Sequence, residues 1–201
     1  AGLTRLRLEV RNGVEGPPGG YAAYSAGGSA AAWDARRYVV TNDNSNPSVI
    51  NAAGFDFAEL DHNVEYVVLP MRDILAARGE QLYLNICYVA FVDGAVGVHE
   101  SPAEYAEFAL ATMLHLRQKY GLEPDAWEVI LEPDIAGRWS GQRIGQTIVA
   151  TAQRFDQNAI RAKFIAPSTT SMANASTYFD GIASVSGAVA RMSELSYHRY
   201  S

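Results

Sequence analysis

The segment YAEFALATMLHLRQKYGLEPDAWEVILEPD, residues 105–134, determines the fold class of this protein. In its first part, apolar residues recur every three or four positions from Ala106 to Leu116, which predicts a helix, and Gly121 predicts where that helix ends. Its second part, WEVILEP at 127–133, is a short apolar run that predicts a buried strand. A helix followed closely by a buried strand is typical of α/β proteins.

The same alternation extends over the rest of the chain. The patterns predict strands at 2–11, 81–91, 127–133, 163–167 and 192–200, helices at 56–79, 101–121, 144–155 and 177–190, and an irregular segment at 12–55. In the first helix, Asp56 and Glu59 predict a capping box, and Pro70 predicts a bend or a break. Strict alternation implies parallel strands, which fits a doubly wound sheet, a flavodoxin-like sandwich or part of a (β/α)8 barrel.

The composition excludes several classes of function. The 22 acidic and 16 basic residues give a formal net charge of −6, and Lys and Arg form no cluster, which argues against nucleic-acid and anionic-membrane partners. No apolar run reaches the roughly 18 residues of a membrane span. The single cysteine, Cys87, excludes an internal disulfide framework and a multi-cysteine zinc site. No glycine-rich phosphate-binding motif follows a predicted strand, and we expect neither a cofactor nor a metal.

Functional groups in parallel α/β folds gather at the carboxyl ends of the strands. Glu132 ends the apolar run at 127–133, where partial desolvation suits a proton donor. It could equally be a structural carboxylate paired with an arginine such as Arg7, and the spacing alone leaves both interpretations open. The pair His99-Glu100, read with Asp93 as metal ligands, lacks a second histidine at helical spacing, so a zinc site is not expected.

Three segments resemble clan A glycoside hydrolases, which are (β/α)8 barrels. The segment at 105–134 is similar to their third helix and fourth strand, where the general acid/base glutamate precedes a proline. GLTRLRLEV at 2–10 resembles their second strand, and LSYHRY at 195–200 resembles their sixth strand. The resemblance therefore implies an incomplete (β/α)8 barrel, with strands two to six in one partial domain at 1–201.

The resemblance also implies the roles of particular residues. Glu132 would be the acid/base of retaining hydrolysis of a β-linked oligo- or polysaccharide, and Arg7 would hold the nucleophile ionised. His198 and Tyr200 would line the sugar-binding subsite. Aromatic residues such as Trp139 could stack on sugar rings.

Two features depart from the family pattern. Leu131 stands where these enzymes usually have an asparagine before the acid/base. Their nucleophile, a glutamate at the end of the seventh strand, has no counterpart here, so we expect this chain to be inactive by itself. A catalytically inactive carbohydrate-binding barrel, or an unrelated α/β enzyme that uses Glu132 as acid/base, are the alternatives. We expect a carbohydrate substrate and a secreted or periplasmic location, and the sequence predicts no oligomeric state.

Overall fold

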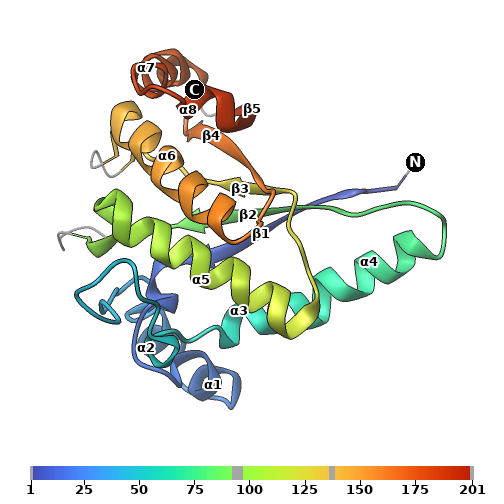
Figure 1. Ribbon diagram of the computed structural model, residues 1–201. Helices are drawn as coiled ribbons and strands as arrows, with labels where there is room; N and C mark the ends of the chain where they lie inside the picture. The colour runs from blue at the N-terminus through green and yellow to red at the C-terminus, as the bar shows by residue number, and fades with distance from the viewer. Residues whose placement is uncertain (1, 92–96, 136–138, 200–201) are drawn as a thin grey trace.

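The computed structural model describes residues 2–91, 97–135 and 139–199, which are built around a five-stranded parallel sheet (Figure 1). The strands are β1 (Arg5–Arg11), β2 (Tyr83–Val89), β3 (Ala126–Glu128), β4 (Lys163–Thr169) and β5 (Met192–Tyr197). Their order in the sheet is the same as their order in the chain. Because that order never reverses, the described strands do not form a doubly wound or flavodoxin-like sheet, and they match the wall of a barrel.

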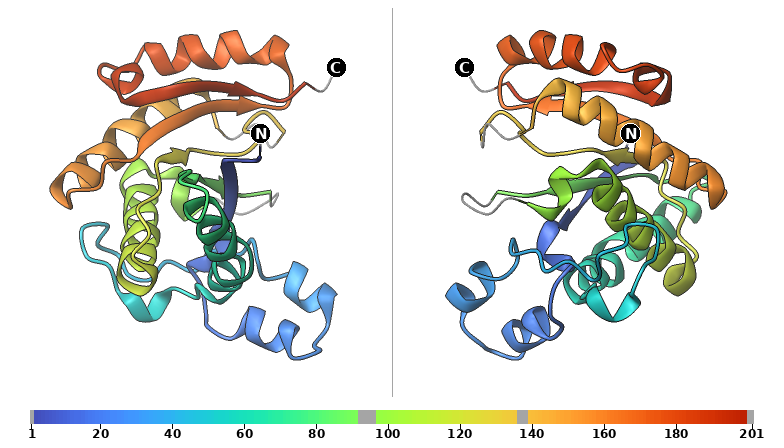
Figure 2. Two further views of the ribbon diagram at one scale, coloured as in Figure 1. Left: turned by 90° about the vertical axis from the view of Figure 1, so that its right-hand side faces the viewer. Right: turned by 60° about the vertical axis from the view of Figure 1, so that its left-hand side comes forward.

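Helices connect successive strands and cover one face of the sheet (Figures 1 and 2). They are α1 (Gly20–Ser25), α2 (Ala30–Asp34), α3 (Ala58–Asn63), α4 (Leu69–Ala76), α5 (Pro102–Tyr120), α6 (Gly141–Gln157), α7 (Met172–Ala183) and α8 (Ala188–Arg191). Shorter helical turns are η1 (Asn12–Val14), η2 (Ala52–Gly54), η3 (Val64–Val68) and η4 (Val98–Glu100). No helix of the described ranges is both long enough and apolar enough to cross a bilayer.

An ion pair across the uncovered face shows that the sheet is curved. Arg5 on β1 and Glu194 on β5 lie on the two edge strands, yet their side chains approach to 2.5 Å, and the Tyr83 hydroxyl donates to the same carboxylate at 2.9 Å. In a flat sheet, the edges of five strands would be roughly 19 Å apart. The strands therefore form a curved wall, and the predicted incomplete (β/α)8 barrel is confirmed.

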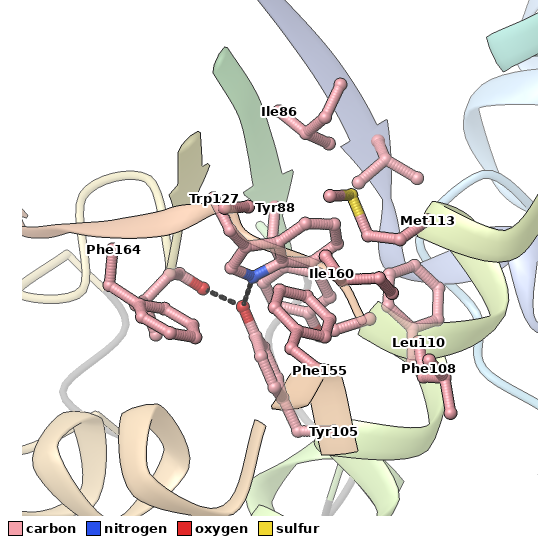
Figure 3. Packing of buried hydrophobic residues seen from close by; sticks show 14 of the residues in the cluster. Ile86, Tyr88, Tyr105, Phe108, Leu110, Met113, Trp127, Phe155, Ile160 and Phe164 are labelled. Carbon is pink, nitrogen blue, oxygen red and sulfur yellow. Dashed lines mark hydrogen bonds between the residues drawn. The ribbon is translucent and has the colours of Figure 1, made fainter. Parts of the chain in front are cut away.

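Aromatic side chains dominate the core between the sheet and helices α5 and α6 (Figure 3). Trp127 of β3 is fully buried, and its indole N–H donates to the Tyr105 hydroxyl at 2.7 Å. That hydroxyl donates in turn to the carbonyl of Val129. The polar atoms of both rings are thus satisfied inside an apolar layer, as buried Trp and Tyr require.

The predicted capping box at the start of α3 is wrong. Asp56 does accept a hydrogen bond from the Ala58 N–H at 3.2 Å, but Glu59 turns away from the backbone to pair with Arg11 at 2.6 Å. A half-buried guanidinium at the end of β1 is a stronger partner for this carboxylate than a backbone N–H. The predicted interruption at Pro70 is confirmed, because the helix passes through the π-helical turn η3 immediately before α4.

Other element boundaries also differ from their predictions. β3 ends at Glu128, which is well before the predicted residue 133. The predicted helix at 177–190 is two helices, α7 and α8. Helix α5 lies within one residue of its predicted bounds at both ends.

The segment at 12–55, predicted as irregular, contains α1 and α2 and is anchored to the sheet by a buried polar chain. The Glu15 carboxylate lies 2.5 Å from Nε2 of His99, whose Nδ1 lies 2.9 Å from the hydroxyl of Tyr88 on β2. All three side chains are buried. His99 therefore fixes this segment in place, and the described residues contain no group of acidic, histidine or cysteine side chains able to hold a metal.

A buried carboxyl group of α5 interacts electrostatically with the same segment. Glu107 is almost fully buried, and one of its oxygens has no hydrogen-bond partner in the described part of the chain. The same is true of one carboxylate oxygen of Asp43 in the segment. Desolvation, together with repulsion from Asp43, Glu104 and Glu15, raises the pKa of Glu107 to about 8. Glu107 is therefore protonated at neutral pH.

We expect Glu107→Gln to abolish part of the pH dependence of stability. The folded protein holds the Glu107 proton up to about pH 8, whereas the unfolded chain releases it near 4.5, so its contribution to stability is complete below pH 4.5 and is lost as the pH rises to 8. Between pH 5 and 8, the free energy of unfolding of wild type should fall relative to the variant by on the order of 3 kcal/mol. Urea unfolding across this range measures it.

The exposed Glu123→Gln is the control, and should follow the wild-type pH profile. Parallel profiles for wild type and Glu107→Gln would show that Glu107 is ionised in the folded protein.

Candidate active site

Two ionisable side chains meet at the carboxyl ends of β3 and β5. Oε1 of Glu132 lies 2.5 Å from Nδ1 of His198, and these side chains are 12% and 22% exposed. A carboxylate that is mostly buried, in contact with an imidazole and still reachable by solvent can exchange a proton with a bound molecule. This pair is the centre of the candidate site.

The backbone at Glu132 explains how its side chain reaches His198. Glu132 has a φ of 53°, in the left-handed region that residues other than glycine rarely adopt. Its N–H donates to the carbonyl of Ser168 at 2.9 Å, and Ser168 itself has a φ of 55°. Each such conformation costs about 1–3 kcal/mol, so the surrounding contacts must hold it. These two residues turn the chain at the ends of β3 and β4.

Hydrogen bonds between β4 and β5 complete the frame of the site. The hydroxyls of Ser168 and Ser196 lie 2.6 Å apart, and the His198 N–H donates to the carbonyl of Thr169 at 2.6 Å. The imidazole is thus held through its own backbone as well as through its ring. Ser196 was not singled out from the sequence, because a polar residue in a strand has no distinctive pattern.

Asp134 accepts hydrogen bonds that hold the loop following Glu132 in place. Its carboxylate accepts hydrogen bonds from the Thr170 N–H and hydroxyl, both at 2.8 Å, and from the Asn174 amide at 2.7 Å. Burial raises the pKa of Asp134, but these hydrogen bonds outweigh it, so the pKa lies below its ordinary value. The ionised carboxylate ties the β3–α6 loop to the start of α7.

Leu131 occupies the place of the asparagine that the resemblance expects. It is buried in a small apolar cluster with Cys87 and Val89 of β2, and Tyr38 packs against that cluster. Burial raises the pKa of the Cys87 thiol well above its ordinary value, which makes it a packing residue. This side of Glu132 is therefore apolar.

Arg7 lies in the middle of β1, on the concave face of the sheet. Its guanidinium is 3.6 Å from Glu9 and 3.7 Å from Glu128, which also accepts a hydrogen bond from Asn85 at 2.8 Å. The open alternative in which Arg7 pairs with Glu132 is not what the described residues show. Glu128, buried below the site, was not singled out from the sequence.

The remaining predicted site residues do not lie at the site in the described structure. Trp139 is 5% exposed and packs against the buried rings of Tyr88 and Tyr105, so its side chain belongs to the core and cannot stack on a sugar. That expectation overlooked the helix layer that covers Trp139. Tyr200 lies outside the described residues. Asp93, the third member of the metal-ligand interpretation, also lies outside them.

The strand order and the position of the site at the strand ends identify the fold class. The chain is part of a (β/α)8 barrel with a carboxylate at its carboxyl rim. Among solved structures, the chain is similar to the catalytic domain of GH30 xylanase C from Talaromyces cellulolyticus, with a TM-score of 0.62 and 14% sequence identity. The similarity covers 100% of this chain and 45% of that chain, so this chain spans less than half the length of its structural neighbour. No family model matches the sequence, and no curated protein matches it.

We expect His198→Ala in the full-length gene product to lower kcat for the glycoside hydrolysis proposed below by about ten- to a hundredfold while KM changes little, because the imidazole orients Glu132 and does not need to bind the substrate. His198→Gln, whose amide can still reach the carboxylate, should recover part of the loss. Steady-state kinetics across pH 4–9 measure both variants. A rise in KM with kcat unchanged would instead assign His198 to substrate binding, which is the role that the family resemblance implies.

Proposed function

We propose that this chain is the acid/base half of a retaining glycoside hydrolase that cleaves a β-linked oligo- or polysaccharide. The observation that carries the proposal is the contact between Glu132 and His198 at the carboxyl rim of a barrel whose fold is shared with a xylanase catalytic domain. The 14% identity supports the fold, and the chemistry rests on the site.

In the proposed reaction, Glu132 protonates the glycosidic oxygen as the bond to the leaving group breaks. It then removes a proton from the water that releases the covalent glycosyl-enzyme intermediate. His198 holds the carboxyl group in position for both steps. The nucleophile would be a carboxylate outside these 201 residues, and Arg7, on the concave face, would keep it ionised.

The nucleophile should lie about 5–5.5 Å from the Glu132 carboxyl group, the spacing of retaining enzymes. Asp134 does not fit this role, because hydrogen bonds to Thr170 and Asn174 occupy both of its oxygens. We therefore propose that this chain alone does not hydrolyse glycosides. A polysaccharide substrate also favours a secreted or periplasmic location, since such chains do not cross membranes.

The test is hydrolysis of aryl β-glycosides by the full-length gene product, comparing wild type with Glu132 variants as set out in the Discussion. A second candidate function, an inactive barrel that binds carbohydrate, is favoured by Leu131, because the apolar cluster around it offers the sugar no hydrogen bond at this position. Binding of an oligosaccharide without turnover by the wild-type protein would support that alternative.

A further inference from the structure

An extra residue interrupts the pairing of β4 with β5 at the candidate site. Pro167 pairs with Ser196 of β5. Thr169 pairs with Tyr197, the next residue of β5, so Ser168 between them is an extra residue in a β-bulge. Its φ of 55° is left-handed, and its side chain is fully buried. Bulges redirect a strand locally and are common next to active sites. This bulge therefore sets the direction in which β4 ends.

The bulge lies between the two partners of the candidate pair. Glu132 follows β3 and His198 follows β5, and β4 lies between these strands (Figure 1). Strands two apart in a sheet are separated by about 10 Å, so the two side chains meet only by reaching over the end of β4. Two successive carbonyls of β4 hold their backbones. The Ser168 carbonyl accepts the Glu132 N–H at 2.9 Å. The Thr169 carbonyl accepts the His198 N–H at 2.6 Å.

One side-chain hydrogen bond ties the bulge to β5. The hydroxyls of Ser168 and Ser196 lie 2.6 Å apart. Side chains alternate along a strand, so Glu194, Ser196 and His198 share one face of β5. This is the concave face, because Glu194 pairs there with Arg5. Ser196 therefore meets the bulge on the face that carries the imidazole.

We propose that the hydroxyls of Ser168 and Ser196 are positioning groups for the reaction, because they fix the bulge in the form that brings the acid/base against its histidine. Without this hydrogen bond, a left-handed residue other than glycine relaxes toward an ordinary backbone conformation. The carbonyl of Ser168 would then turn away from the Glu132 N–H, and the carboxyl group would lose its alignment with the glycosidic oxygen. The catalytic consequence rests on the proposed function, whereas the contact between Glu132 and His198 needs no catalysis.

Leaving-group kinetics of the full-length gene product test this assignment. Ser196→Ala should lower kcat/KM for a phenyl β-glycoside by about tenfold, because proton donation by Glu132 depends on its alignment. It should change kcat/KM for a dinitrophenyl β-glycoside by less than about twofold, because that leaving group departs without protonation. Ser196→Thr keeps a hydroxyl and suits a strand, so it should recover the wild-type values to within about twofold.

Two substitutions of Ser168 separate the hydroxyl from the backbone. Both remove the hydroxyl, but only glycine adopts a φ of 55° without strain. Ser168→Ala should therefore lose about as much as Ser196→Ala, roughly tenfold, whereas Ser168→Gly should lose about threefold or less. The double variant Ser168→Gly/Ser196→Ala should resemble Ser168→Gly, because a glycine bulge no longer needs the hydroxyl bond.

Ser184→Ala is the matched control for these variants. Its hydroxyl also makes a hydrogen bond, to the Gly181 carbonyl at 2.7 Å, but it lies beyond the last residue of α7, away from the site. It should leave the kinetics unchanged with both leaving groups. Thermal melts verify that each variant is folded.

The nitrogen signals of the His198 imidazole report on the contact without any substrate. They are measured in long-range proton–nitrogen NMR spectra of the full-length gene product, with His198→Gln to assign them. The Nδ1 signal should move in Ser196→Ala in the same direction as in Glu132→Gln, because both variants remove the carboxylate from the ring. Ser196→Thr should keep the wild-type signal.

Equal losses for both leaving groups would make the two serines merely structural and overturn the proposal. Wild-type kinetics in Ser196→Ala, an unmoved Nδ1 signal in that variant, or a Ser168→Gly variant as slow as Ser168→Ala would also overturn it. A protein that hydrolyses no glycoside but shows the expected movement of the Nδ1 signal would refute the proposed function and retain the serines as the groups that hold Glu132 against His198.

Discussion

Glu132→Ala in the full-length gene product should lower kcat/KM for an alkyl or phenyl β-glycoside by about 10²–10⁴-fold, the usual contribution of a general acid. The same variant should retain much of the first chemical step for a dinitrophenyl glycoside, because that leaving group departs without protonation. Deglycosylation would then limit the rate, since no base activates water. Added azide should restore turnover, because it is a nucleophile that needs no general base and is small enough for the space left by the carboxylate.

Glu123→Ala is the matched control for this experiment, because it removes a glutamate that is 58% exposed and pairs with Arg117 away from the site. It should leave the kinetics unchanged with every leaving group. If Glu132→Ala loses the same factor for good and poor leaving groups and azide has no effect, Glu132 is not the proton donor. A wild-type protein that is inactive from the start would favour the carbohydrate-binding alternative.

Trp127→Ala should cost about 3–5 kcal/mol in free energy of unfolding, the usual range for a large aromatic side chain removed from a core. Trp127 is fully buried between β3 and helices α5 and α6, where it contacts the rings of Tyr105 and Phe155 edge-on (Figure 3). The substitution leaves a cavity and also removes the N–H that donates to the Tyr105 hydroxyl. Urea unfolding followed by circular dichroism measures the loss.

One further variant separates the contributions to this loss of stability, and a second variant is the control. Trp127→Phe keeps most of the volume and removes the N–H, so it should cost less than Trp127→Ala, with the remainder due to the cavity. Trp33→Ala is the matched control, because Trp33 is half-buried in the segment at 12–55 and should cost about 1 kcal/mol or less. Similar losses for Trp127→Ala and Trp33→Ala would mean that the core does not depend on the β3 layer as described.

Much of the fold was predictable because the signals are local. The apolar spacing of α5 and the glycine at its end, Gly121 with a φ of 63°, place that helix within a residue or two of its predicted bounds. Boundaries failed where a long-range contact competed with a local one. Glu59 binds Arg11 in preference to the helix start, and the backbone leaves the β3 ladder before its left-handed turn at Glu132.

The candidate site was predicted in part. Glu132 was named from its position at a strand end, and His198 from the family resemblance as a residue of the sugar subsite. Their direct contact was not predicted. Trp139 was expected at the surface of the site and lies in the core. The spacing of an aromatic residue in a loop does not reveal which layer will cover it.

The sequence by itself determined the α/β class, the parallel strands and the strand end that carries the acidic group, since these depend on the period of apolar residues along the chain. The tertiary structure alone decided how strongly the sheet curves and which distant side chains meet. Arg5 reaches Glu194 across 189 positions of the chain, and Glu132 reaches His198 across 66. Such contacts depend on the summed twist of every strand between the partners and on single left-handed residues, and neither leaves a periodic trace in the sequence.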